Sequence, residues 1–177
     1  MSKAFTREDD GAAATPLAVP HRAPLPTHQP NYVTPRGLAA LRVEMTGLDA
    51  ERARLAHGEP SEPDSRRSLE AIDARRRDLE TRLATALVVE GAGDPADSAI
   101  VRFGARVHVR AATGVERRYH IVGVDEADVG AGRIAFVAPI ARALLGHRIG
   151  ETVVVRTPRG EEELEIVAVS SGASDPP

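Results

Sequence analysis

Cysteine and tryptophan are absent from this 177-residue chain, and aromatic residues make up only 3% of it. Without cysteine the protein has no disulfide framework and no thiolate zinc site, which fits a cytoplasmic location. No run of 18 apolar residues occurs, so we expect no transmembrane helix and no membrane partner. A net charge of −3 gives no indication of a general nucleic-acid binder, because binding to phosphate requires clustered lysine and arginine.

The ends of the chain and one internal segment also lack the marks of regular structure. Residues 1–30 have five prolines after position 15 and no periodic apolar face, so we expect them to have no fixed structure. We expect the same of residues 172–177. Residues 91–98, rich in glycine, alanine, aspartate and proline, are interpreted as a linker.

Two apolar stripes with helical spacing fill the segment between residues 31 and 90. They consist of Leu38, Leu41, Met45, Leu48, Arg52 and Leu55, and of Leu69, Ile72, Arg76, Leu79, Leu83 and Ala86. Paired end to end, the two stripes are symmetric about Glu62, as an antiparallel helical hairpin requires. We therefore predict a coiled-coil hairpin over residues 31–90 with its tip near residues 58–64.

Local signals place the ends of these two helices. Thr34 followed by Pro35 is a good helix start, and Gly58 is a natural stop after His57. Asp64 or Ser65 can cap the second helix, which we expect to continue to about residue 87. Arg52 and Arg76 occupy apolar stripe positions, and we interpret them as covering the seam with their aliphatic stems.

Beyond the linker the hydrophobic period changes from that of a helix to that of strands. Alternating runs separated by glycine-containing turns predict five strands, near residues 105–110, 118–124, 133–137, 152–156 and 163–169. A short helix from Pro139 to Leu145 interrupts them. Residues 99–171 are thus predicted to form a small antiparallel sheet domain with one short helix, and the whole chain is predicted to be an α+β protein.

Few side chains form a recognisable chemical constellation. Glu59 and Glu62 lie at the predicted hairpin tip, where a solvated helix-to-helix turn is the simpler interpretation. His108 and His120 fall in strands without a suitably spaced third ligand, so we interpret them as sheet residues and not as a metal site. The sequence has no phosphate-binding loop and no nucleophile motif.

Several longer sequence segments, in order along the chain, resemble the GreA/GreB family of bacterial transcript cleavage factors, with more similarity to the GreB branch. They include Asn31-Tyr-Val-Thr-Pro-Arg-Gly-Leu, Tyr119-His-Ile-Val-Gly-Val-Asp-Glu-Ala-Asp, Ala138-Pro-Ile-Ala-Arg-Ala-Leu-Leu-Gly and Val155-Arg-Thr-Pro-Arg-Gly-Glu. The resemblance covers nearly everything from residue 31 to residue 170.

The resemblance implies an FKBP-like C-terminal domain that docks on the rim of the secondary channel of RNA polymerase. The hairpin would enter this channel and reach nascent RNA and DNA only within the polymerase complex. Such a protein is not an enzyme, has no cofactor of its own and acts on no small-molecule substrate. At most, Glu59 and Glu62 would share the Mg²⁺ of the polymerase and help it to hydrolyse its own transcript. The implied polymerase-binding residues are Asp125, Glu126, Pro139, Ile140, Ala141 and Arg142.

The tip departs from the family pattern, and this leaves two mechanisms open. Glu59 replaces the expected Asp, Pro63 replaces an Asn, and the hairpin is shorter by roughly two helical turns per arm, which withdraws the tip by about 10 Å. The protein would then either stimulate transcript cleavage or regulate the polymerase without cleavage. A prolyl isomerase on an FKBP-like sheet is a third reading, disfavoured because this domain offers only Phe103, Tyr119 and Phe136 as aromatic residues. A plain protein-interaction module with another partner is a fourth.

Overall fold

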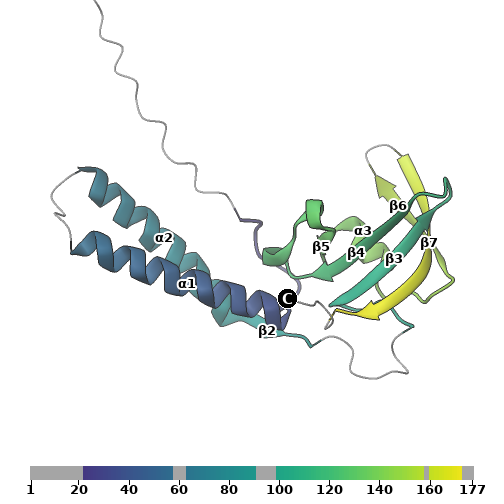
Figure 1. Ribbon diagram of the computed structural model, residues 1–177, viewed down its shortest axis with the longest axis horizontal. Coiled ribbons are helices and arrows are strands. Elements are labelled where there is room, and N and C mark those ends of the chain that lie inside the picture. Colours follow the sequence, from purple (N-terminus) through teal and green to yellow (C-terminus); the bar gives the residue numbers. More distant parts are fainter. Residues whose placement is uncertain (1–21, 58–62, 91–98, 158–159, 173–177) are drawn as a thin grey trace, which may run out of the picture.

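The computed structural model describes residues 22–57, 63–90, 99–157 and 160–172. They form two long antiparallel helices and a five-stranded sheet domain, and the helical pair projects away from the sheet (Figure 1). This arrangement confirms the predicted α+β fold class with a helical hairpin followed by a small sheet domain. Within the described ranges, no helix combines the length and the apolar character needed to cross a membrane.

The hairpin consists of α1 (Pro35–Ala56) and α2 (Pro63–Thr85). The hydroxyl oxygen of Thr34 accepts a hydrogen bond from the backbone N–H of Gly37 at 3.0 Å, so the predicted start of the first helix is confirmed. The second helix begins at Pro63, before the cap predicted at Asp64 or Ser65. Proline fits the first turn of a helix, where its missing N–H needs no partner.

The two apolar stripes pack against each other along the hairpin. Its buried centre is formed by Leu41, Leu48, Ile72 and Leu79, with Met45, Leu55 and Leu83 packed against them. Ion pairs between the helices join Arg52 to Asp73 at 2.6 Å and Arg76 to Asp49 at 2.7 Å. Both pairs are symmetric about a point between residues 62 and 63, which agrees with the predicted register. The two stripe arginines therefore lie along the seam with their charged ends paired.

The base of the hairpin differs from the prediction. We expected residues 86 and 87 to continue the second helix, but β2 (Ala86–Val88) leaves the helix and pairs in parallel with β1 (Asn31–Val33). The backbone N–H of Val89 donates to the carbonyl of Val33 at 3.0 Å. The apolar periodicity could not reveal this, because the pairing partner lies more than fifty residues away in the sequence.

The C-terminal domain has one mixed sheet in the order β5-β4-β3-β7-β6. Its strands are β3 (Ala105–Ala111), β4 (Glu116–Val122), β5 (Arg133–Ala135), β6 (Thr152–Thr157) and β7 (Gly160–Ser171). The short helix α3 (Pro139–Leu144) packs mainly against β6. All five strands and the helix lie close to their predicted positions.

The sheet is not entirely antiparallel, as we had expected it to be. β5 runs parallel to β4, because the chain between them turns back through the short 3-10 helices η2 (Val124–Glu126) and η3 (Val129–Ala131). The remaining neighbours are antiparallel. Alternation of apolar residues indicates a strand but does not indicate the direction of its neighbour, so the sequence pattern did not distinguish the two arrangements.

The core of this domain borrows an aromatic side chain from the hairpin base. Tyr32 of β1 packs against Phe103 and Phe136, with ring centroids 5.6 Å and 5.5 Å away. Such aromatic contacts each contribute about 0.5–1.5 kcal/mol beyond area burial. The hairpin and the sheet domain are therefore joined by shared packing as well as by the chain.

Residues 22–30 also have defined contacts, although we expected no fixed structure for residues 1–30. Leu25 packs against the core of the sheet domain, and the carbonyl of Ala23 accepts a hydrogen bond from Arg82 at 3.0 Å. One apolar side chain and one backbone acceptor are enough to place an extended segment, and neither gives a periodic signal in the sequence. Residues 1–21, the predicted 91–98 linker and residues 173–177 lie outside the described residues.

Candidate functional site

The acidic tip predicted from the sequence lies outside the described residues, because both Glu59 and Glu62 fall in the gap between the two helices. α1 has 22 residues, which at about 1.5 Å per residue gives an arm of roughly 33 Å. The described ends of the two helices, at Ala56 and Pro63, lie at the end of the hairpin far from the sheet domain (Figure 1).

Asp125, predicted to bind the partner, is a buried residue at the junction of the two parts. Its side chain is 4% exposed, and its Oδ1 accepts a hydrogen bond at 2.7 Å from Nη1 of Arg82, which is also 4% exposed. Arg22 donates to the same oxygen at 3.2 Å. Asp125 therefore bonds the sheet domain to the second helix and does not present its carboxylate to solvent.

Arg82 is the centre of this junction. Its Nε donates to Asp78 at 2.8 Å, while its two terminal nitrogens bond Asp125 and the carbonyl of Ala23. Burial alone would lower the pKa of Arg82, but the hydrogen bonds to Asp78 and Asp125 raise it above its ordinary value. The guanidinium is therefore a fixed positive charge that holds the first described segment, the hairpin and the sheet domain together.

Glu126, in the η2 turn, takes part in the same junction by bonding to the start of the other long helix, α1. Its Oε1 accepts hydrogen bonds from the backbone N–H of Thr34 at 2.9 Å and of Gly123 at 3.3 Å. Its other oxygen bonds the Thr34 hydroxyl. Because Thr34 caps α1, Glu126 fixes the start of the first helix to the η2 turn.

The sequence analysis missed this junction for an identifiable reason. The contacts join residues separated by 43 positions (Arg82 to Asp125) and by 92 positions (Thr34 to Glu126). The available signal was a charged residue, Arg82, next to the apolar stripe of the second helix. A fixed charge beside a buried stripe needs a counter-charge, and Asp125 supplies it together with Asp78.

The other predicted binding residues lie on α3, some on its exposed face and some on its buried face. Pro139 and Arg142 are exposed, Ile140 is half-buried, and Ala141 is fully buried in the core of the sheet domain. Proline at the first position sets the helix, and Ala141 and Leu144, three residues apart, face the sheet. A partner can reach Pro139 and Arg142 directly, whereas Ala141 acts through packing.

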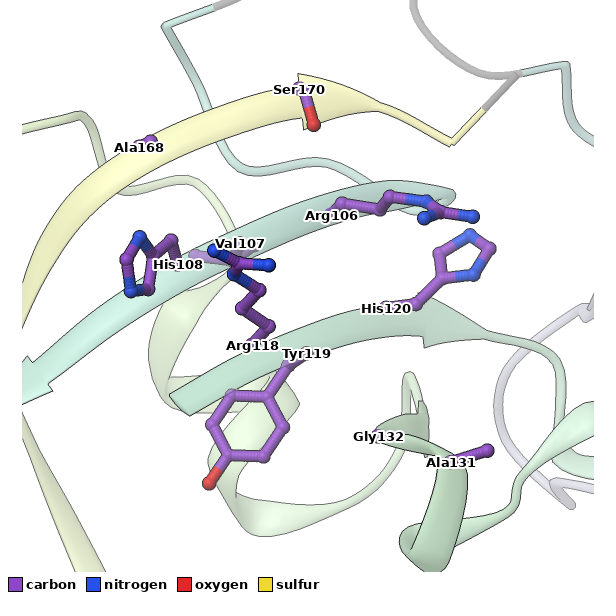
Figure 2. Close-up of a pocket in the computed structure, with 10 residues that line it drawn as sticks. All are labelled: Arg106, Val107, His108, Arg118, Tyr119, His120, Ala131, Gly132, Ala168 and Ser170. Atoms are coloured by element: carbon purple, nitrogen blue, oxygen red, sulfur yellow. The ribbon is translucent and has the colours of Figure 1, made fainter. Parts of the chain in front are cut away.

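Described residues line two concave regions, and neither includes a residue of α3. The first, of about 520 Å³, lies between the hairpin base and the sheet domain and is lined by both charge signs, including Arg36, Glu44, Asp128 and Arg133. The second, of about 390 Å³, lies on the outer face of the sheet and is lined by Arg106, His108, Arg118 and His120 without any acidic residue (Figure 2). In the described part of the chain, no group of three or more histidine, aspartate or glutamate residues could hold a metal ion.

The aromatic residues of the domain do not form an open pocket of the prolyl isomerase kind. Phe103 and Phe136 contact each other with ring centroids 5.7 Å apart, and both pack against Tyr32. Their faces are therefore used in the core of the domain.

Comparison with known proteins finds relatives with GreA or GreB in their names. Residues 96–171 match the family described as "Transcription elongation factor, GreA/GreB, C-term". A transcription elongation factor GreB of Neisseria meningitidis is 36% identical over 156 residues, covering 81% of this chain and 95% of that protein. A transcription elongation factor GreA of Pseudomonas putida is 43% identical over 98 residues, covering 55% of this chain and 61% of that protein. Among solved structures, the GreA factor homolog 1 (Gfh1) of Thermus thermophilus is 22% identical with a TM-score of 0.39, covering 81% of this chain and 100% of that chain.

Proposed function

This chain belongs to the GreA/GreB family of transcription elongation factors, and we propose that it acts on RNA polymerase with its hairpin directed into the secondary channel. The family supports RNA polymerase as the partner. The observation that carries the proposal is a roughly 33 Å helical arm that projects from a sheet domain and is fixed to it. A narrow rigid arm suits insertion into a channel, while the sheet domain remains at its rim.

In this proposal α3 contributes to docking on the channel rim through Pro139 and Arg142, which are exposed, and Ile140, which is half-buried. Ala141 supports this surface from beneath. Asp125 and Glu126 have a different part: they hold the hairpin at a fixed angle to the docking domain, and so determine where the tip points. The site residues suggested by the resemblance thus divide into a contact surface and a positioning junction.

We propose further that the protein regulates elongation with weak or absent stimulation of transcript cleavage. The alignment with the Neisseria GreB runs over 156 residues but uses 81% of this 177-residue chain, which is about 143 residues. The difference is close to what a hairpin shorter by about two turns per arm would produce, since a helical turn has 3.6 residues. Mg²⁺ binds carboxylate at about 2.1 Å, so a tip withdrawn by about 10 Å leaves Glu59 and Glu62 out of its reach.

The chemistry in this scheme remains that of the polymerase, and the protein is not itself an enzyme. Where the tip does reach the polymerase Mg²⁺, Glu59 and Glu62 are the residues that would share it, as carboxylates that complete a metal site. RNA and DNA are met only inside the polymerase complex.

The decisive experiment uses a stalled elongation complex with Mg²⁺, and compares the native chain with a Glu59→Ala/Glu62→Ala double variant. We expect both proteins to bind core polymerase in a pulldown and to leave the transcript equally uncleaved. Brisk cleavage by the native chain that is lost in the double variant would contradict the regulatory mechanism and assign catalytic support to the acids. A failure of the native chain to bind polymerase would overturn the proposed function itself.

Docking is tested separately with α3. Arg142→Glu should weaken polymerase binding by about tenfold or more, because it reverses an exposed charge in the proposed contact surface. Arg156→Glu is the matched control: this residue is 89% exposed and lies on β6, outside that surface. Equal effects of the two variants would remove α3 from the docking surface.

A further inference from the structure

Residues 22–30, which we call the strap, cross the junction between the hairpin and the sheet domain, and the proposed function does not use them. They form neither a helix nor a strand. The carbonyl of Ala23 accepts a hydrogen bond from Arg82 of α2 at 3.0 Å, and Leu25 packs against the core of the sheet domain. Prolines flank this leucine on both sides. Because proline fixes φ, the strap loses less conformational entropy when a few contacts hold it in place.

Arg22, the first residue of the strap, joins two acids that belong to different parts of the molecule. Its Nη1 donates to Oδ1 of Asp125 in the η2 turn at 3.2 Å, and its Nη2 donates to Oε2 of Glu44 on α1. The Arg22 and Glu44 side chains are half-buried, and that of Asp125 is buried. The planar guanidinium group therefore connects the first helix to the sheet domain through two separate nitrogens.

An arginine of α2 also holds each of these two acids. Arg75 donates to Oε1 of Glu44 at 2.9 and 2.7 Å, and Arg82 donates to Asp125 at 2.7 Å. Two turns of helix separate Arg75 from Arg82, which places them on one face of α2. The charges alternate in sign along the series Arg75, Glu44, Arg22, Asp125 and Arg82. Arg22 is the centre of this series, and without it the series separates into two pairs.

The bond from Arg22 to Glu44 supports the hairpin at a point away from its base. Glu44 comes nine residues after Pro35, the first residue of α1, so it lies roughly 14 Å along the helix. The bonds between Thr34 and Glu126 lie at the base, directly before the helix begins. A contact farther along the arm opposes tilting more effectively than a contact at the base, because it acts on a longer lever.

We infer that Arg22 is a positioning residue, and that the strap fixes the angle between the hairpin and the sheet domain by joining Glu44 to Asp125. The inference extends the proposed function and rests on it, because the angle of the arm determines whether the tip is directed into the channel. In the free protein the same contact limits the opening of the junction, and this can be measured without the polymerase.

The first test is amide hydrogen exchange of the free full-length chain, followed by NMR at two amides that the strap does not bond. The N–H groups of Thr34 and Gly123 both donate to Glu126 across the junction, at 2.9 and 3.3 Å. Arg22→Gln should accelerate their exchange by about tenfold or more, the factor expected for loss of a hydrogen bond between charged groups. The amide of Val107, in the buried strand β3, should not change if the domain remains folded.

Arg67→Gln is the matched control. It removes the same charge from an exposed ion pair with Asp64, near the start of α2 and far along the hairpin from the junction, so it should change the exchange of Thr34 by less than about twofold. Deletion of residues 1–21 leaves the strap in place and should behave like this control, whereas deletion of residues 1–30 should behave like Arg22→Gln. Unchanged exchange in Arg22→Gln, equal effects of the two substitutions, or equal effects of the two deletions would overturn the inference.

A second measurement separates positioning from docking. Arg22→Gln should bind core polymerase within about twofold of the native chain, because the proposed surface on α3 is intact, but it should lose the effect of the native chain on elongation by a stalled complex. Loss of binding would place Arg22 in the contact surface, and an unchanged effect on elongation would show that the angle is not set by the strap; either result overturns the inference. If the native chain itself does not bind polymerase, the proposed function fails, while the exchange experiment still tests the strap.

Discussion

At the scale of single residues, the structure shows a structural role for the two acids after β4, Asp125 and Glu126. The family resemblance implies that they contact a partner, and the tertiary structure shows that they join two parts of the molecule. Asp125 and Arg82 are each 4% exposed, so their attraction acts in a region of low dielectric. A residue in a loop that resembles a binding motif can thus act on binding by positioning another element.

The buried pair predicts a large stability effect. Asp125→Ala should lower the free energy of unfolding by about 3 kcal/mol, because it leaves Arg82 buried with Asp78 as its remaining carboxylate. Urea unfolding followed by circular dichroism measures this. Glu161→Ala, which breaks the exposed pair with Arg156, is the control and should cost less than about 1 kcal/mol. A similar small effect of both variants would show that the buried pair does not stabilise the fold.

The ion pair between Arg52 of α1 and Asp73 of α2 predicts a lowered pKa for Asp73. The hydrogen bond from Arg52 lowers the pKa of Asp73 below its ordinary value of 3.8, although desolvation opposes it. Because the folded-state pKa is the lower one, this contribution to stability is present above pH 3.8 and is lost as the pH falls through the folded pKa. Carboxyl NMR titration should show the lowered pKa of Asp73 in the native chain and a rise of this pKa in Arg52→Ala.

Arg67→Ala provides the comparison for this titration. Arg67 pairs with Asp64 on the same helix and is not among the arginines that lower the pKa of Asp73, so that pKa should not change. An equal rise of the pKa in both variants would mean that general helix charge, and not the Arg52 hydrogen bond, sets it.

At the scale of elements, the first helix contains two glycines with opposite consequences. A Cβ at Gly47 would meet nothing within 4 Å, whereas a Cβ at Gly37 would lie 2.1 Å from Cδ of Glu126. That glutamate cannot move freely, because it bonds Thr34 and Gly123. Gly37 is therefore required by the junction, while Gly47 is only a weak point of the helix.

Substitution by alanine should separate the two positions. Gly47→Ala should raise the free energy of unfolding by about 1 kcal/mol, the helix-propensity difference between the two residues. Gly37→Ala should lower it by about 1 kcal/mol or more, because displacement of Glu126 breaks hydrogen bonds that cap α1. Thermal and urea unfolding measure both changes, and equal stabilisation by both substitutions would contradict the close contact.

At the scale of the whole molecule, the sheet domain is not a fully self-contained unit. Its core includes Tyr32 from the hairpin base, and the η2 turn contacts both β1 and the start of α1. The hairpin therefore shares one packed junction with the domain, which keeps the arm at a fixed angle.

The fragment 96–171 tests this dependence. We expect it to fold, because its strands bury their own core, but to unfold at a lower temperature than the full chain, since Phe103 and Phe136 lose the ring of Tyr32. Tyr32→Ala in the full chain should shift the melting temperature in the same direction. Equal melting temperatures of fragment and full chain by circular dichroism would show that the junction adds nothing to the domain.

The same fragment tests where the polymerase affinity lies. Since the proposed docking surface on α3 is within it, the fragment should compete with the full chain for core polymerase. Failure to compete, with folding confirmed, would move the affinity to the hairpin or to the angle between the two parts.

The sequence by itself determined the elements of this protein. Helical and strand periods come from local burial, so the stripes from Leu38 to Leu55 and from Leu69 to Ala86, and the five alternating runs, indicated their elements directly. The register of the hairpin also followed, because two stripes can be matched in only a few ways.

Only the tertiary structure decided how these elements are joined and which charged residues lie close together. The parallel pairing of β1 with β2, the direction of β5, the Arg82–Asp125 bond and the four bases around the concave region on the outer sheet face all depend on residues distant in sequence. Periodicity reports which face of an element is buried, but it does not report what lies against that face. The bases Arg106 and Arg118 were therefore visible in the sequence, but only the pairing of β3 with β4 placed them on one face of the sheet.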